Sequence, residues 1–197
     1  MGWRPLVAPV LIVHAIAADI DLAGVAALAF TSAAGVRAFA DAAPRRDLPV
    51  FAVGGATAEA ARAAGFAHVL ASKGDVEALA EVIAAARPSL VLAPTALEPA
   101  ADLPALLAAR GVKARSVVLY ETVPARPTPS ADIDAVLVHS PRAARIIAEL
   151  IAPDMAARLS AFAISEAAAS PLRALPFARI VIAPFPDEAS LLHLLEG

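Results

Sequence analysis

The sequence has no cysteine among its 197 residues and few aromatic side chains, which make up 5% of the chain. The lack of cysteine excludes disulfides and thiolate metal sites. With so few aromatics, the core must consist mainly of Ala, Val, Leu and Ile. The net charge of −3 lacks the basic excess that general nucleic-acid binding requires, so we expect no nucleic-acid partner. No apolar run reaches the roughly 18 residues of a spanning helix, so we expect no membrane partner.

The clearest pattern is a short apolar segment that is followed at once by a hydroxyl residue and then by a helix-compatible run. Residues 27–30 are apolar, Thr31 and Ser32 follow, and residues 33–40 favour a helix. Ser32 is a natural N-cap, because its oxygen can accept from a free N–H group of the first helical turn. The remaining free N–H groups of such a turn are suited to binding an anionic group.

This strand–turn–helix pattern recurs in both halves of the chain. It appears again at residues 50–64, 136–147 and 162–175. The repetition indicates an α/β fold of two similar lobes, each a parallel sheet flanked by helices. The segment 123–130 holds three prolines, favours an extended linker and places the boundary between the lobes.

The candidate ligand-binding residues all follow predicted strands, at the sheet edge where open α/β sheets bind ligands. They are Thr31, Ser32, Gly55, Thr57, Ser140 and Ser165. Each hydroxyl residue is either a plain helix cap or a ligand contact. As a set, they predict that a cleft between the lobes accepts a ligand with several carboxylates.

Tyr120 is the single tyrosine of the chain and ends a predicted strand, 114–120, just before the linker. A phenol beside the cleft could donate a proton or a hydrogen bond to a leaving group. The alternative is an amphipathic tyrosine at the edge of a lobe, with no chemical role.

The motifs of metal and nicotinamide sites are missing. The histidines at 14, 68, 139 and 193 are not paired at metal-ligand spacing, so we predict no metal. No G-x-S-x-G nucleophile elbow is present. The Gly54-Gly55 pair lacks the third glycine of a dinucleotide fingerprint, so we predict no nicotinamide cofactor.

Taken in order, the motifs resemble those of the uroporphyrinogen-III synthase family across residues 3–195. The matching stretches are 30–36, 52–58, 74–79, 118–122, 138–141, 163–165 and 186–187. The resemblance implies two α/β lobes joined by a two-stranded linker, with residues 1–12 plus 124–197 in one lobe and 13–123 in the other. It also implies a cytoplasmic lyase of haem biosynthesis, which uses no cofactor. The reaction is the cyclisation of the linear tetrapyrrole hydroxymethylbilane, with loss of water and inversion of the last ring, and Tyr120 would be catalytic.

The sequence also departs from the family pattern. Members usually carry a further strand and helix with a Thr-Arg-Pro motif before the segment matched by residues 2–5, so one lobe is expected to lack these elements. Ala168 stands where members often have threonine, and residues 93–95 stand where they often have Gly and Arg. These departures leave open a non-catalytic tetrapyrrole- or anion-binding protein of the same fold. We expect a monomer, with dimerisation through an exposed sheet edge as the alternative.

The first residues allow a second interpretation. Arg4 precedes an apolar run from Leu6 to Ala18, and residues 15–17 resemble a signal-peptide cleavage site. Cleavage there would suit a two-lobed periplasmic solute-binding protein. The family resemblance instead favours a buried strand over residues 6–13.

Overall fold

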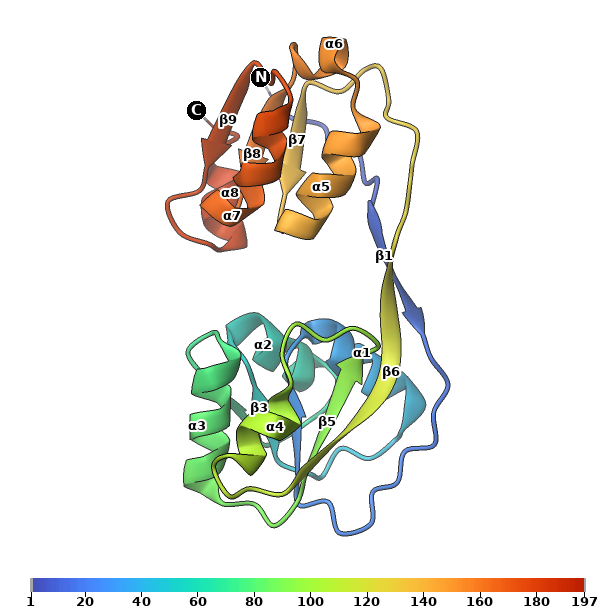
Figure 1. Cartoon of the computed structure of the whole chain (residues 1–197), viewed down its shortest axis with the longest axis vertical. Helices are drawn as coiled ribbons and strands as arrows, with labels where there is room; N and C mark the ends of the chain where they lie inside the picture. The colour runs from blue at the N-terminus through green and yellow to red at the C-terminus, as the bar shows by residue number, and fades with distance from the viewer. Residues whose placement is uncertain (1, 197) are drawn as a thin grey trace. The chain divides into compact units, whose positions relative to one another are not determined.

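The computed structural model describes residues 2–196 and divides into two compact units. Unit 1 contains Met1–Ile12 and Val123–Gly197, and unit 2 contains Val13–Thr122. The chain passes between the units twice, once within strand β1 (Leu11–Ala15) and once within strand β6 (Ala114–Pro124) (Figure 1). These two strands are neighbours in one sheet.

Unit 2 is organised around a sheet with the strand order β1-β6-β5-β2-β3-β4. Its other strands are β2 (Ala27–Phe30), β3 (Val50–Ala52), β4 (Val69–Ala71) and β5 (Val91–Ala96). Strands β2 to β6 pair in parallel, and Leu28 of β2 lies between Val50 of β3 and Leu92 of β5. The chain proceeds from β2 towards one edge and returns to the other side of β2 with β5. The gap between β2 and β5 is therefore the topological switch point, whose carboxyl end is the usual ligand site of such sheets.

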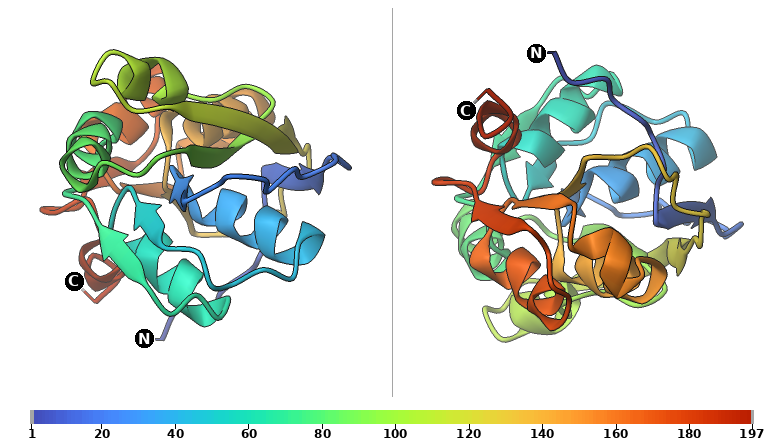
Figure 2. Two further views of the ribbon diagram at one scale, coloured as in Figure 1. Left: turned by 90° about the horizontal axis from the view of Figure 1, so that it is seen from below. Right: turned by 90° about the horizontal axis from the view of Figure 1, so that it is seen from above.

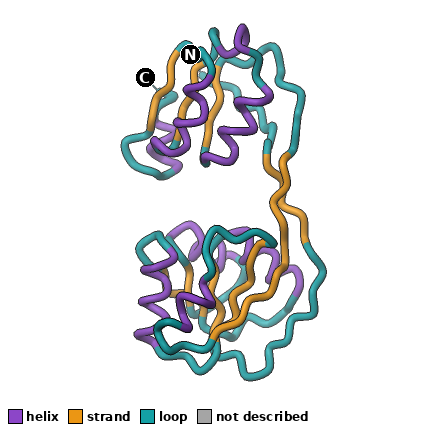
Figure 3. Tube along the Cα trace, viewed as in Figure 1, coloured by secondary structure: helices purple, strands orange, loops and turns teal. Residues whose placement is uncertain are grey.

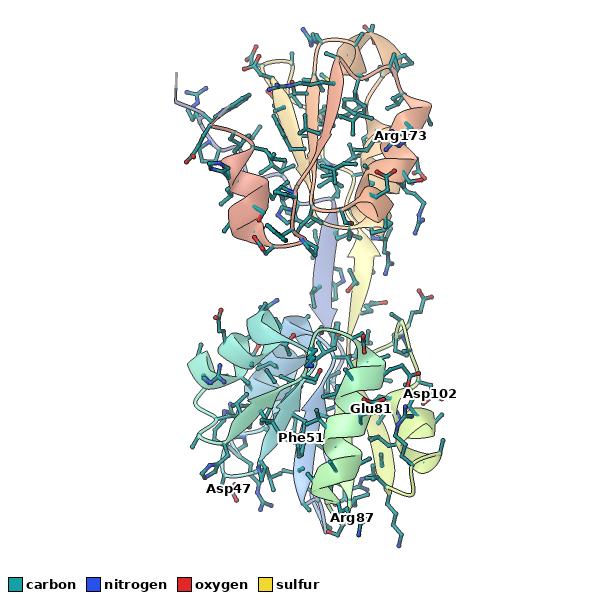
Figure 4. All side chains as sticks on the ribbon, turned by 90° about the vertical axis from the view of Figure 1, so that its left-hand side faces the viewer. Asp47, Phe51, Glu81, Arg87, Asp102 and Arg173 are labelled. Atoms are coloured by element: carbon teal, nitrogen blue, oxygen red, sulfur yellow. The ribbon has the colours of Figure 1, made fainter. Side chains whose placement is uncertain are left out.

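Helices cover both faces of this sheet (Figures 1 and 2). Helices α1 (Ala33–Ala42) and α2 (Gly55–Ala63) bury Phe39 and Ala61 against Phe30 on one face. Helices α3 (Val76–Ala86) and α4 (Leu103–Ala108) pack on the other face, where Phe51 lies beside α3 (Figure 4). Strands β2 and β3 are apolar throughout because both of their faces are buried.

Unit 1 has a smaller sheet, with β7 (Ala135–Val138), β8 (Ser160–Ala163) and β9 (Arg179–Ile182) in that order and parallel. Helical segments flank it on both faces (Figure 3). One face packs against α5 (Pro141–Leu150), α6 (Pro153–Ala156), α7 (Glu166–Ala169) and the 3-10 segment η1 (Ser170–Ala174). The other packs against α8 (Glu188–His193).

Three element predictions need correction. The strand predicted over residues 6–13 begins only at Leu11, because Pro9 cannot donate to a sheet, and Leu6 and Val7 are exposed. The strand predicted to end at Tyr120 continues to Pro124, because β1 lies beside it. The helix predicted towards residue 175 ends at Ala169 and gives way to η1, in which Pro171 lacks an N–H donor.

Candidate functional site

The switch point of unit 2 brings together two residues from the sequence-based list. Ser32 follows β2 and caps α1, with its Oγ accepting from the Gly35 N–H at 3.1 Å. The same oxygen lies 2.7 Å from the hydroxyl of Tyr120. Tyr120 lies in β6 opposite Ala96 of β5, and Tyr120 is only 6% exposed. A helix cap, a phenol and the first turn of a helix thus meet in one hydrogen-bonded chain.

Thr31 lines a pocket to which its neighbour Ser32 does not contribute. This pocket has a volume of about 190 Å³, and its other polar lining residues are Thr95, Ser116 and Asp102. Ala93 and Leu103, which also line this pocket, belong to the core on the α3–α4 face. Sequence reasoning did not select Thr95, Ser116 or Asp102 as site residues. Thr95 could have been selected from the sequence, because its hydroxyl follows directly after the apolar run 90–94.

Of the two interpretations of Thr57, a helix cap or a ligand contact, the start of α2 excludes the N-cap. Gly54 occupies the N-cap position and provides no side-chain hydrogen bond. Thr57 lies inside the helix, 5% exposed, and makes no hydrogen bond through its side chain to any residue in the described range 2–196. A Cβ added to Gly55 would meet nothing within 4 Å, so the space beside this first turn is open. The first-turn N–H groups of α2 are therefore available to an acceptor.

The turn after β4 packs against the start of α2. Ser72 donates to the Val53 carbonyl at 2.9 Å, and a Cβ on Gly54 would lie 3.5 Å from the Cα of Gly74. Lys73 stands between these two contacts in the chain and is exposed. It adds a positive charge to the carboxyl edge of the sheet, and sequence reasoning did not select it. An anionic group would be attracted by this charge.

Unit 1 has its own pair of capped turns after parallel strands. Ser140 follows β7 and accepts from the Ala143 N–H at 3.1 Å, while Ser165 follows β8 and accepts from Ala168 at 3.3 Å. Beside them, His139 Nε2 lies 2.7 Å from Glu188 Oε2, and both side chains are about half exposed. The serines are therefore caps, at the sheet edge where a ligand contact remains a proposal.

Two kinds of feature are absent from residues 2–196. No three His, Asp or Glu residues gather closely enough to hold a metal ion. No helix in this range combines the length and apolar character needed to cross a membrane.

The fold and the candidate residues define an α/β protein whose capped and open helix starts lie at the carboxyl ends of parallel strands. The chain belongs to the uroporphyrinogen-III synthase family, a family of lyases in haem biosynthesis: the family model described as "Uroporphyrinogen-III synthase HemD" matches residues 1–193. The resemblance that the motifs indicated is thereby confirmed.

Solved structures are similar in fold. The chain matches uroporphyrinogen-III synthetase from Helicobacter pylori 26695 with a TM-score of 0.73 and 18% identity, covering 95% of this chain and 90% of that chain. It matches a mutant uroporphyrinogen III synthase from the extremely thermophilic bacterium Thermus thermophilus with a TM-score of 0.52 and 16% identity, covering 95% and 86%. No curated protein matches the sequence significantly. The predicted α/β class with parallel sheets flanked by helices is confirmed.

Proposed function

We propose that this chain is a uroporphyrinogen-III synthase, which cyclises hydroxymethylbilane with inversion of the last pyrrole ring and loss of water. The family match over residues 1–193 supports the reaction class. The observation that carries the proposal for this chain is the hydrogen-bonded pair of Ser32 and Tyr120 at the switch point of unit 2.

Tyr120 is the proposed catalytic residue. Loss of water from the substrate requires a proton for the departing hydroxyl, and a phenol can supply it or share it through a hydrogen bond. The phenol is held within β6 by its core packing and by Ser32, so its position is fixed before the substrate arrives.

The proposed substrate-binding residues are Thr31, Ser32, Gly55, Thr57, Ser140 and Ser165. The acetate and propionate groups of a tetrapyrrole are carboxylates, which hydroxyl groups and helix N–H groups can bind. The open first turn of α2 is the best supported of these contacts, since no side chain caps it and the space beside Gly55 is free.

The further parts of the proposal concern organisation. We propose that residues 1–12 plus 124–197 and residues 13–123 are two domains, and that the protein is a cytoplasmic monomer. No cofactor enters the proposed reaction, which rests on positioning and acid assistance.

An isomer assay tests the function directly. Hydroxymethylbilane closes without an enzyme to the type I isomer, so a synthase must yield type III faster than type I forms. The products can be oxidised to porphyrins and separated by chromatography. Formation of the type I isomer alone would contradict the proposed synthase activity. Binding of uroporphyrinogen without turnover would support the non-catalytic binding protein instead.

The Tyr120→Phe variant tests the catalytic residue. We expect kcat to fall on the order of a hundredfold with little change in KM, because a general acid typically contributes that much. Unchanged kinetics in a folded variant would remove Tyr120 from the mechanism.

A further inference from the structure

The hydrogen bond between Ser32 and Tyr120 can run in either direction, and the direction decides where the phenolic hydrogen points. Ser32 Oγ already accepts from the Gly35 N–H at 3.1 Å. If Tyr120 donates to Ser32, the phenolic hydrogen is occupied within unit 2. If Ser32 donates, the phenol oxygen becomes an acceptor and its own hydrogen is left for another group.

We infer that Ser32 donates to Tyr120 and thereby directs the phenolic hydrogen towards a ligand, which makes Ser32 a positioning residue for the proposed acid. This inference rests on the proposed function. It assigns Ser32 a role beyond capping α1 and contacting the substrate.

Two physical arguments favour this direction. A hydroxyl that accepts a hydrogen bond becomes a better donor. A chain in which Gly35 N–H donates to Ser32, and Ser32 donates to Tyr120, is therefore stabilised by mutual polarisation. Either direction leaves one of the two hydroxyl hydrogens without an acceptor among residues 2–196, and in the inferred direction it is the phenolic hydrogen, which a ligand can then accept. In addition, the start of α1 carries partial positive charge, which favours hydroxyl dipoles with their hydrogens directed away from the helix.

The surroundings of Tyr120 strengthen the argument. The residue is 6% exposed and belongs to the core cluster that contains Phe30 and Leu119. The ring therefore has little freedom to move, and the phenolic hydrogen can only rotate about its C–O bond. A donor fixed 2.7 Å away restricts that rotation to directions away from Ser32.

The first test needs no substrate. Tyr120 is the only tyrosine, so isotope-labelled tyrosine gives a single Cζ resonance in nuclear magnetic resonance spectra. Donation by a phenol moves this resonance downfield, towards phenolate, and acceptance moves it upfield. Removing Ser32 as a donor should therefore shift the Cζ resonance of Ser32→Ala downfield. An upfield shift would show that Tyr120 is the donor, and an unchanged resonance would show no hydrogen bond; either overturns the inference.

Matched variants separate positioning from capping. Ser32→Thr keeps the hydroxyl and should restore the wild-type resonance. Asp75 caps α3 in the same unit by accepting from the Ala78 N–H at 2.7 Å. Asp75→Ala should therefore cost about as much stability as Ser32→Ala, while leaving the Tyr120 resonance and kcat unchanged.

Kinetics provide the second test. Ser32→Ala should lower kcat about tenfold, because the phenolic hydrogen is no longer directed, and should raise KM less. In the Tyr120→Phe background the same substitution should not lower kcat further, since the two residues act as a unit. Additive losses would overturn the inference. If the wild-type chain produced no type III isomer, the proposed function would fail, while the resonance would still decide the direction of the hydrogen bond.

Discussion

Gly35 in α1 faces the carbonyl oxygen of Pro94 in β5 so closely that an added Cβ would lie 3.2 Å from that oxygen. This approach holds the first turn of α1 against the switch point of the sheet. Glycine is normally unfavourable inside a helix relative to alanine, by about 0.5–1 kcal/mol. Its presence here is explained by the neighbouring strand and not by helix propensity.

The first prediction concerns this contact. Gly35→Ala should lower the free energy of unfolding by about 1 kcal/mol, because a central strand cannot move away easily and overpacking outweighs the gain in helix propensity. Denaturant unfolding measures the change. Gly55→Ala is the control, since its Cβ would meet nothing within 4 Å and should cause no loss. A stabilised Gly35→Ala variant would show that β5 yields to the added methyl group.

A second prediction concerns Arg46, which joins the ends of two helices. Its guanidinium donates to the carbonyls of Ala40 at 2.7 Å, Ala43 at 2.6 Å and Ala64 at 2.8 Å. It also lies 5.1 Å from the ring centre of Phe66. Arg46→Met should cost about 2–3 kcal/mol of stability, because several charge-assisted hydrogen bonds to helix carbonyls are lost together.

The adjacent residue provides the control for Arg46. Within residues 2–196, the Arg45 side chain forms an exposed ion pair with Asp47, at 2.9 Å, and such pairs contribute little. Arg45→Met should change stability far less than Arg46→Met does, as measured by the same unfolding experiment. Equal losses of stability in both variants would show that the hydrogen bonds of Arg46 to the helix carbonyls do not stabilise the fold.

A third prediction separates binding from stability at Thr57. Because its side-chain hydroxyl makes no hydrogen bond to residues 2–196, Thr57→Val should leave stability within about 0.5 kcal/mol of the wild type. If the hydroxyl contacts a substrate carboxylate, the variant should raise KM for hydroxymethylbilane about fivefold to tenfold. Thr57→Ser should retain binding. Unchanged KM together with unchanged stability would remove Thr57 from the proposed site.

A fourth prediction concerns acid pH and Asp187, the N-cap of α8. The hydrogen bond from the Ser190 N–H, 2.7 Å long, is the main cause that lowers the pKa of Asp187 below 3.8. A carboxylate whose pKa is lowered on folding stabilises the folded state above its unfolded pKa, and this contribution is lost as the pH falls through its folded pKa. The wild type should therefore lose stability below about pH 3.8.

Asp187→Asn isolates this contribution. Asparagine is also a good N-cap but does not titrate, so the variant should lose less stability than the wild type between about pH 5 and about pH 3. Thermal unfolding at both pH values measures the difference. Identical pH dependence in both proteins would show that Asp187 contributes no pH-dependent stability.

Structural features that depend on neighbouring residues were predicted well from the sequence. Contacts between residues far apart in the chain were not. The cap role of Ser32 follows from its place before a helical run, and the structure confirms it. Its hydrogen bond to Tyr120 joins residues 88 positions apart, and no local pattern carries that information. The same holds for Arg46, whose acceptors belong to two helices.

Errors in the predicted elements have local physical causes. Thr57 was interpreted as a possible cap, but glycine is also accepted at the N-cap position and Gly54 takes it, so α2 begins two residues before Thr57. The apolar residues 6–8 suggested a strand, but a proline on either side disfavours sheet pairing. In both cases a residue with special backbone properties, glycine or proline, decided where the element begins.

The chain has one tryptophan and one tyrosine, and each lies in a different unit. Trp3 packs edge-on against Phe162 and donates to the Leu195 carbonyl in unit 1, whereas Tyr120 is buried in the core of unit 2. Each unit therefore carries its own intrinsic optical probe. Indole fluorescence can follow the melting of unit 1, and near-ultraviolet absorption, to which both side chains contribute, can follow both units in the same unlabelled sample. Coincident or separate transitions would reveal whether the halves unfold together.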